Sequence, residues 1–203
     1  MLNLKFFPEH LALSGADLYY HPSYLGAARA LSLYQALESS LAWEQSEIRV
    51  YGKSHKIPRL NAWYGEPGLR YRYSGKTFSA HPWTPELAEL CQGLNQALGT
   101  GFNSVLANYY RTGADAMGWH ADDEPELGPR PVVACVSLGA PRDLRFRHRA
   151  GQGPSFGLRL AHGSLLLMGE GTQTHWQHSL PRRARSGARI SLTFRQVTRP
   201  AHH

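Results

Sequence analysis

The 203-residue sequence lacks any apolar run long enough to cross a bilayer, and it contains only two cysteines. Cys91 and Cys135 lie far apart and lack the paired spacing of a cysteine metal site, so we interpret both as small buried hydrophobic residues in a reducing compartment. The N-terminal residues have no long apolar stretch after Lys5, so we expect no signal peptide. These absences favour a cytoplasmic protein, nucleoid-associated in a bacterium, that binds no membrane.

Internal repeats, low-complexity segments and long linkers are also absent from the sequence. A chain of this length is enough for one sizeable domain with a buried core and too short to expect two domains, so we expect a single domain over residues 1–203. Negative charge is scarce: 22 lysines and arginines against 15 acidic residues leave a net charge of +7 and a pI near 9.6. This excess favours a polyanionic partner, with nucleic acid ahead of an acidic membrane surface.

Two segments show the apolar spacing of helices. Residues 23–41 begin with Ser23, which is suited to an N-cap, and residues 84–99 have Thr84 as a cap, Pro85 in the first turn and Gly99 at the end. After residue 101, short apolar runs between glycines and prolines predict strands: "FNSVLANYY", "VVACVSLG", "DLRFRHR", "FGLRL", "SLLLM" and "RISLTFRQV". Helices followed by strands predict an α+β fold with a mostly antiparallel sheet, either a sandwich or a jelly roll.

The stretch "GWHADDEPELGP" concentrates His120, Asp122, Asp123 and Glu124 in an otherwise basic chain. Residues two apart on extended backbone point to the same side, so His120 and Asp122 can reach one cation. Two histidines and one carboxylate on one face of Fe(II) form the ligand set of non-haem iron oxygenases. The second histidine must come from another strand, and the candidates are His148, His162, His175 and His178. Taken alone, the His-x-Asp pattern fits a solvated loop equally well.

The last predicted strand alternates polar and apolar residues, which puts its two arginines on one polar face. The residues of that face are Arg189, Ser191, Thr193 and Arg195. An inward-facing arginine needs an anion, and a dicarboxylate would satisfy two of them. Asn108 and Tyr110, two apart on an earlier predicted strand, are donors suited to the same anion. The alternative interpretation is an edge strand with surface arginines.

Five blocks occur in the order of a known family: "PRLNAWYGEPGLRYRYSG", "FNSVLANYYRTGADAMGWHADDEPELGP", "VSLGAPRDLRFRHR", "HGSLLLMGEGTQTHWQHSLP" and "RISLTFR". From about residue 50 to 197 the chain resembles the AlkB-type Fe(II)/2-oxoglutarate-dependent DNA dealkylases, especially the animal homologues that repair double- and single-stranded DNA. The resemblance implies a double-stranded β-helix, or jelly roll, with its core at about 101–197. N-terminal helices and a nucleotide-recognition lid at about 45–80 would flank this core.

The resemblance also implies which residues bind iron and co-substrate. The iron ligands would be His120, Asp122 and His178. His175, three residues earlier, is the rival for the last place. Arg189 and Arg195 would pair with the two carboxylates of 2-oxoglutarate. The pocket would be completed by Asn108, Tyr110, Ser191 and Thr193, with Ser191 standing where animal members often carry asparagine.

Further residues are implied for the damaged base and the DNA. Tyr51 falls at a hairpin tip where an aromatic wedge fills the space left by a flipped-out base. Carboxylates beside the base would favour a cationic methylated ring. The residues implied at the base are Tyr71, Tyr73, Ser74, Asp123 and Glu124, and those at the DNA backbone are Arg59, Arg182, Arg183 and Arg185. Without the resemblance, the tyrosines fit a cross-strand aromatic pair and the arginines fit a solvated surface.

The implied activity is oxidative demethylation of 1-methyladenine and 3-methylcytosine in DNA, with release of formaldehyde. Fe(II) would be the cofactor, and 2-oxoglutarate and O₂ the co-substrates. We expect a monomer, and RNA as a further substrate is left open. Two alternatives are a 2-oxoglutarate oxygenase acting on RNA or protein, whose iron and co-substrate residues would look the same, and a catalytically silent nucleic-acid-binding module.

Overall fold

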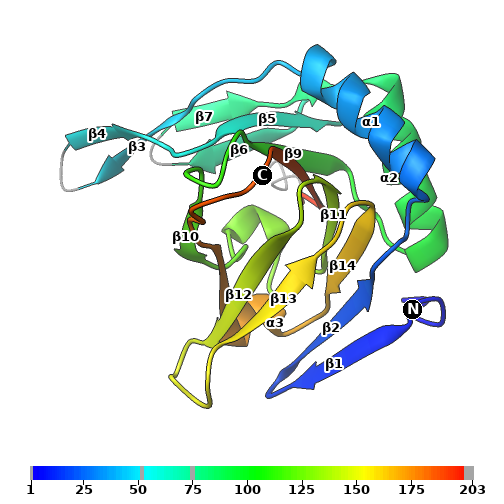
Figure 1. Cartoon of the computed structure of the whole chain (residues 1–203), viewed down its shortest axis with the longest axis vertical. Helices are drawn as coiled ribbons and strands as arrows, with labels where there is room; N and C mark the ends of the chain where they lie inside the picture. Colours follow the sequence, from blue (N-terminus) through cyan, green and yellow to red (C-terminus); the bar gives the residue numbers. More distant parts are fainter. Residues whose placement is uncertain (1, 51–52, 74–75, 199–203) are drawn as a thin grey trace, which may run out of the picture.

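Strands with continuous or alternating apolar residues form two facing sheets in the structure, a computed structural model that describes residues 2–50, 53–73 and 76–198 (Figure 1). Within these residues the larger sheet has eight strands, antiparallel except for the pair β5 and β8. Their order is β1 (Glu9–Leu13), β2 (Ala16–His21), β14 (Ser164–Met168), β11 (Val133–Gly139), β16 (Arg189–Arg195), β9 (Ser104–Tyr110), β5 (Leu60–Gly65) and β8 (His81–Pro82).

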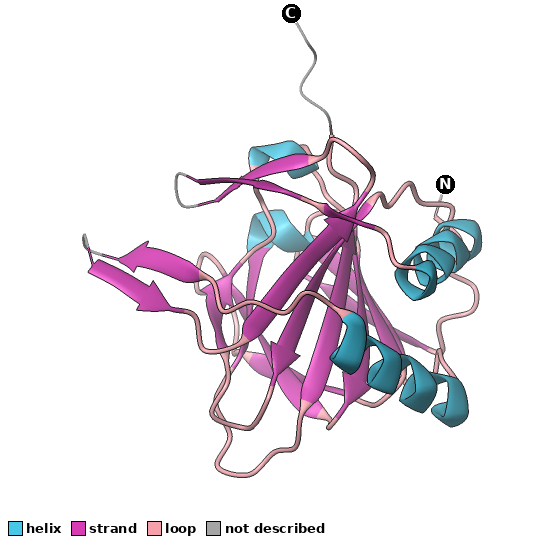
Figure 2. Ribbon diagram, turned by 90° about the horizontal axis from the view of Figure 1, so that it is seen from above, coloured by secondary structure: helices cyan, strands magenta, loops and turns pink. Residues whose placement is uncertain are grey.

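The smaller sheet lies against one half of the larger one and is antiparallel throughout. Its order is β10 (Met117–His120), β15 (Trp176–Leu180), β12 (Arg142–His148) and β13 (Phe156–Leu160). Helices α1 (Ala27–Ser40) and α2 (Pro85–Leu98) cover the outer face of the larger sheet (Figures 1 and 2). The two sheets and the flanking helices confirm the predicted α+β jelly roll.

Two apolar cores hold these layers together. Phe146 and Met168 belong to the core between the sheets, and Leu37 of α1 and Leu94 of α2 belong to the core between the helices and the larger sheet. Each such side chain contributes roughly 1.5–3 kcal/mol when it is fully buried. Because both faces of the central strands are covered, β11 and β14 are buried at nearly every position and do not alternate.

Helix α2 confirms its predicted boundaries. The Thr84 hydroxyl accepts a hydrogen bond from the backbone N–H of Leu87 at 3.3 Å, and Pro85 occupies the first turn, where its missing N–H is no loss. Gly99 ends the helix with a φ of 68°, a left-handed conformation that glycine adopts without strain. Local residue chemistry is sufficient to define this helix.

Helix α1 begins later than predicted, and Ser23 is not its cap. Gly26 occupies the N-cap position in an extended conformation, and no side chain caps the first turn. The backbone N–H of Leu25 donates instead to the carbonyl of Gly163, at 2.9 Å, in the turn before β14. This long-range bond keeps the residues before Ala27 out of the helix, so the predicted start at residue 23 was wrong for a tertiary reason.

The predicted strands after residue 101 are confirmed as β9, β11, β12, β13, β14 and β16. The hairpin formed by β1 and β2 was not predicted. Gly15 lies between these strands with a φ of 70°, which allows the tight reversal. Every second residue of β2 is buried, whereas β1 is mostly exposed at the edge of the sheet. None of the described helices is long and apolar enough to span a membrane.

The region predicted as a lid contains two hairpins with one strand of the larger sheet between them. The hairpins are β3 (Glu47–Val50) with β4 (Lys53–Lys56), and β6 (Arg70–Tyr73) with β7 (Lys76–Ser79). Both project from the same end of the molecule (Figure 2). The intervening β5 pairs with β9. Tyr71 and Tyr73 have their backbone in β6, while Tyr51 and Ser74 lie outside the described residues.

Candidate active site

Two histidines of the predicted metal centre face each other across β10 and β15. Strand pairing runs from Met117 opposite Leu180 to His120 opposite His178, so β10 carries one extra residue in a β-bulge. The centroids of the two histidine rings lie 4.2 Å apart. Asp122 follows just after β10, and one ligand atom from each of His120, Asp122 and His178 lies within 4.8 Å of the others. The predicted convergence of these three residues is confirmed.

Burial and neighbouring charges determine the protonation states at this centre. Burial raises the pKa of the Asp122 carboxyl, but the surrounding positive charges, with Arg195 foremost, outweigh it and hold the pKa below its usual range. Burial, assisted by the charge of His120, lowers the pKa of His178 to about 3. At neutral pH the centre therefore contains a carboxylate and a neutral imidazole, the forms that bind metal ions.

Neighbouring groups orient the two ligands that come from residues 118–122. The Arg195 guanidinium donates to Oδ1 of Asp122 at 2.7 Å, and the backbone N–H of Asp122 donates to Oε1 of Gln173 at 2.9 Å. Nδ1 of His120 lies 2.9 Å from the Gly118 carbonyl, which leaves its Nε2, 3.9 Å from Oδ1 of Asp122, facing the centre. Gln173 belongs to the short helix α3 (Thr172–His175), and no sequence pattern indicated its role.

The donor set fits an Fe(II) ion. Among the described residues, Oδ2 of Asp122 and Nδ1 of His178 are buried without a hydrogen-bond partner, a costly state unless a cation or another partner compensates. The rival His175 is exposed and stacks on His148, with 6.2 Å between ring centroids. Nδ1 of His162 accepts from the backbone N–H of Gly139 at 2.9 Å. Of the four candidate histidines, the geometry brings His178 to the centre.

A narrow cavity extends from the metal centre along the polar faces of β16 and β9. The alternation predicted for β16 is confirmed, because Ile190, Leu192 and Phe194 are buried in the outer core on its opposite face. In the strand pairing, Arg189 lies opposite Tyr110 and Ser191 opposite Asn108. The residues predicted for the co-substrate all line this cavity: Asn108, Tyr110, Arg189, Ser191, Thr193 and Arg195.

The two arginines of this cavity have different surroundings. Arg195 is bonded to Asp122 and so marks the end beside the metal centre. Arg189 is 2% exposed and donates to the hydroxyls of Ser137 and Ser191 at 2.9 and 3.4 Å. No carboxylate of the described chain pairs with Arg189, and its Nε has no hydrogen-bond partner there. A buried guanidinium in this state attracts an anion, so the residues fit a dicarboxylate with one end at the metal and the other at Arg189.

A second cavity of about 260 Å³ also borders His120 and Asp122 and extends beneath the first hairpin. Glu124 lines it, and Oε2 of this residue is buried with no hydrogen-bond partner in the described part of the chain. Arg59, predicted at the DNA backbone, also lines it and donates from Nε to Oδ1 of Asn108 at 2.8 Å. Asp123 instead forms an ion pair with Arg149 and is not among the lining residues.

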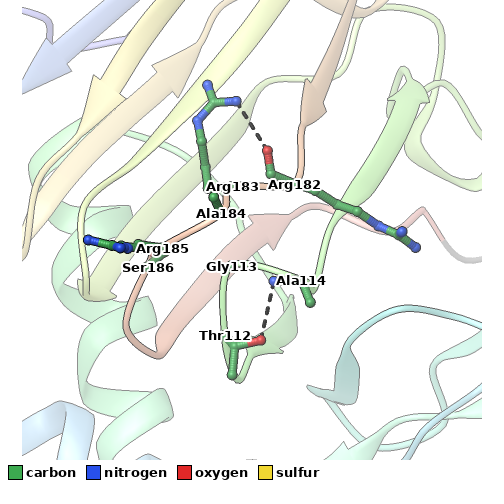
Figure 3. A pocket seen from close by; sticks show the side chains of 8 residues that line it. All are labelled: Thr112, Gly113, Ala114, Arg182, Arg183, Ala184, Arg185 and Ser186. Atoms are coloured by element: carbon green, nitrogen blue, oxygen red, sulfur yellow. Dashed lines mark hydrogen bonds between the residues drawn. The ribbon is translucent and has the colours of Figure 1, made fainter.

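The second basic segment lies away from the metal, in the loop after β15. Arg182, Arg183 and Arg185 border an open surface pocket of about 680 Å³ together with Thr112–Ala114 (Figure 3). Their side chains are exposed and point in different directions. Arg183 also pairs with Asp143, at 3.2 Å, so Arg182 and Arg185 are the freer of the three cations.

A jelly roll that brings two histidines and one carboxylate to the end of an anion-binding cavity defines a non-haem Fe(II) oxygenase. The family described as the 2OG-Fe(II) oxygenase superfamily matches residues 17–195, and the chain belongs to this family. The cofactor is therefore Fe(II), and the co-substrates are 2-oxoglutarate and O₂.

Named relatives narrow the family to its AlkB type, which confirms the resemblance. The chain is 42% identical over 200 residues to the DNA oxidative demethylase ALKBH2 of Homo sapiens, covering 93% of this chain and 76% of the relative. It is 35% identical over 187 residues to the alpha-ketoglutarate-dependent dioxygenase alkB homolog 3 of Homo sapiens, covering 87% and 65%. The solved structure of OsALKBH1 matches with a TM-score of 0.64 and 16% identity over 93% of this chain and 100% of that one, which supports the fold alone.

Proposed function

We propose that this enzyme repairs DNA by oxidative demethylation of N-alkylated bases such as 1-methyladenine and 3-methylcytosine. Its relatives include enzymes named as DNA oxidative demethylases, at 35–43% identity over most of the chain. The single observation that carries the assignment to cationic bases is the buried, unpaired carboxylate oxygen of Glu124 in the cavity beside the metal centre. A carboxylate in that state is best compensated by a positively charged ligand.

Each group of site residues has a distinct task in this proposal. His120, Asp122 and His178 hold the iron, which with 2-oxoglutarate and O₂ supplies the oxidising power for hydroxylation of the N-methyl carbon, after which formaldehyde leaves. Arg189 binds the co-substrate carboxylate remote from the metal, and Arg195 orients Asp122 while facing the nearer one. Asn108, Tyr110, Ser191 and Thr193 donate or accept hydrogen bonds along the co-substrate.

The base is held in the second cavity. Glu124 stabilises its positive charge, and Arg59 offers donors to its polar edge while its bond to Asn108 joins the two cavities. Arg182 and Arg185 contact the phosphate backbone, as their exposure and charge favour. All these groups come from one chain, so we infer that the enzyme works as a monomer. We further infer that it acts in the cytoplasm, associated with the nucleoid in a bacterium, because its substrate is DNA.

The test is incubation of the iron-loaded protein with 2-oxoglutarate, air and oligonucleotides that carry single methylated bases. DNA in single- and double-stranded form and RNA of the same sequence are compared, and the mass of each base is followed. We expect conversion of 1-methyladenine and 3-methylcytosine to the unmodified bases in DNA. Conversion only in RNA would instead assign the enzyme to RNA. Conversion of no nucleic acid would favour a protein substrate or a catalytically silent binding module.

Substitution of Glu124 tests the role of its charge. Glu124→Gln should lower kcat/KM for cationic 3-methylcytosine by at least about tenfold, which corresponds to about 1.4 kcal/mol. It should change the rate for neutral 3-methylthymine far less, because no ring charge is stabilised there. Asp123→Asn is the matched control, since Asp123 pairs with Arg149 outside the cavity. Equal losses on both bases would show that Glu124 serves packing and not charge recognition.

A further inference from the structure

Arg142, the first residue of β12, is a buried guanidinium with 2% of the residue exposed. It donates to the carbonyls of Pro181, Asp115 and Thr112 at 2.8, 3.1 and 3.4 Å. In the part of the chain that the structure describes, it forms no ion pair with a carboxylate, and its Nε has no hydrogen-bond partner. The carbonyl dipoles and the nearby carboxylate of Asp115, which is already paired with Arg111, compensate this buried charge incompletely, so Arg142 leaves positive potential in its surroundings.

The positive electrostatic potential of Arg142 extends to the co-substrate cavity. Cζ of Arg142 lies 5.9 Å from the ring centroid of Tyr110, and Cζ of Arg189 lies 5.5 Å from the same centroid. Tyr110 and Arg189 line the cavity, whereas Arg142 is not among the lining residues. Burial is the main cause of the lowered pKa of Arg142, and the charge of Arg189 lowers this pKa further, because the two cations repel each other in a low dielectric. A negative charge in front of Arg189 relieves that repulsion.

We propose that Arg142 is a positioning residue that supports Tyr110 and adds its charge to that of Arg189, so that the cavity prefers dianionic over monoanionic 2-oxo acids. The inference rests on the proposed function, which puts the remote carboxylate of 2-oxoglutarate at Arg189. A single buried arginine would recognise that carboxylate by hydrogen bonds. With Arg142 as a second cation behind Tyr110, a ligand without the remote carboxylate loses electrostatic attraction to Arg142 in addition to its hydrogen bonds to Arg189.

Arg142 also has a scaffolding role that a test must separate from this one. Its carbonyl partners lie in the loop after β9 and in the loop after β15, whose neighbouring residues border the pocket in Figure 3. The two loops touch, because the backbone N–H of Arg183 donates to the Gly113 carbonyl at 2.8 Å. If Arg142 only connects these loops, its loss should weaken the binding of every ligand of the cavity alike. If its charge attracts the remote carboxylate, its loss should weaken the binding of dianions alone.

Equilibrium binding distinguishes the two roles without turnover. Protein loaded with Mn(II) in place of iron, without O₂, is titrated calorimetrically with the dianion 2-oxoglutarate and with the monoanion 2-oxobutyrate. Arg142→Gln keeps an amide donor for the carbonyls but loses the charge, whereas Arg142→Lys keeps the charge. We expect the glutamine variant to bind 2-oxoglutarate about tenfold more weakly, with 2-oxobutyrate changed less than about twofold, and the lysine variant to recover much of the preference.

Arg145→Met on the same strand is the matched control, since Arg145 is bonded to Ser155 on the outer side of the sheet and should leave both affinities unchanged. Thermal unfolding and Mn(II) affinity establish that each variant is folded, and Arg142→Met replaces the glutamine variant if that one is not. Equal weakening of both ligands, or no change in either, would overturn the inference. Failure of the wild-type protein to bind 2-oxoglutarate would overturn the proposed function itself, a result distinguishable from the other two.

Discussion

At the scale of single residues, the site depends on groups whose protonation state is set by burial and by neighbouring charges. Asp122 stays ionised although it is buried, because Arg195 lies 2.7 Å away, and His178 stays neutral because burial disfavours its charged form. The same residue types outside this environment are ordinary polar side chains. His175, three residues from His178, is exposed and has none of these partners.

The two histidines of "THWQH" therefore provide a direct comparison at this scale. His178→Ala should abolish turnover and weaken Mn(II) binding severely, because one of three protein ligands is lost. His175→Ala should retain turnover and metal affinity, since this ring contacts His148 and not the centre. Metal titration and demethylation assays on both variants check the prediction. An inactive His175 variant beside an active His178 variant would reverse the assignment.

At the scale of elements, the metal centre depends on irregular pieces of structure. The bulge in β10 sets His120 opposite His178, and helix α3 places Gln173 against the backbone of Asp122. Gln173 is 1% exposed, so its amide is fixed by its surroundings and its Nε2 donates to the Met168 sulfur at 3.5 Å. A group that holds a ligand in this manner influences metal affinity without contacting the metal.

Gln173→Leu is the test of this element. Loss of the acceptor for the Asp122 N–H should weaken Mn(II) affinity by about ten- to a hundredfold, the effect usual for groups that orient metal ligands. Competition with a fluorescent chelator measures this affinity. Gln177→Leu is the control, because Gln177 accepts from Arg147 on the exposed side of β15. Wild-type affinity in a folded Gln173 variant would show that Asp122 needs no such support.

At the scale of the whole molecule, the two sheets enclose several ionisable residues. Asp122, His178, Arg142 and Arg189 are all at most 6% exposed. Asp122 follows β10 and the other three lie on β12, β15 and β16, so these ionisable groups are buried together only in the folded state. We therefore expect acid to unfold the protein by protonating specific buried residues.

Stability of the metal-free protein should fall as the pH is lowered from 6.5 to about 3. In this window the unfolded chain binds a proton at its histidine that the buried His178 does not accept, so protonation favours unfolding by up to about 1.4 kcal/mol per pH unit. The depressed pKa of Asp122 adds a loss of stability in more acidic solution. Urea unfolding at a series of pH values measures the slope. His178→Gln should give a shallower slope in the same window, and an unchanged slope would assign the effect to other groups.

Local chemistry in the sequence was enough to determine several parts of this protein. Thr84, Pro85 and Gly99 define α2 because a cap, a first-turn proline and a left-handed glycine act within a few residues. The alternation in β16 determined which face carries Arg189 and Arg195, because side chains alternate on any strand. The motifs that carry the family resemblance were enough to predict the fold, the cofactor and the convergence of His178, and not His175, on the metal centre.

Tertiary structure decided what depends on residues far apart in the chain. The start of α1 follows from a hydrogen bond to Gly163, and the position of Arg59 follows from its bond to Asn108. Gln173 and Arg142 gave no sequence signal. Gln173 lies 51 positions from Asp122, and the carbonyl partners of Arg142 lie 27, 30 and 39 positions from it, spacings that belong to no helix or strand. Such contacts depend on strand order, register and one β-bulge, which the packing of the whole chain selects and no local pattern encodes.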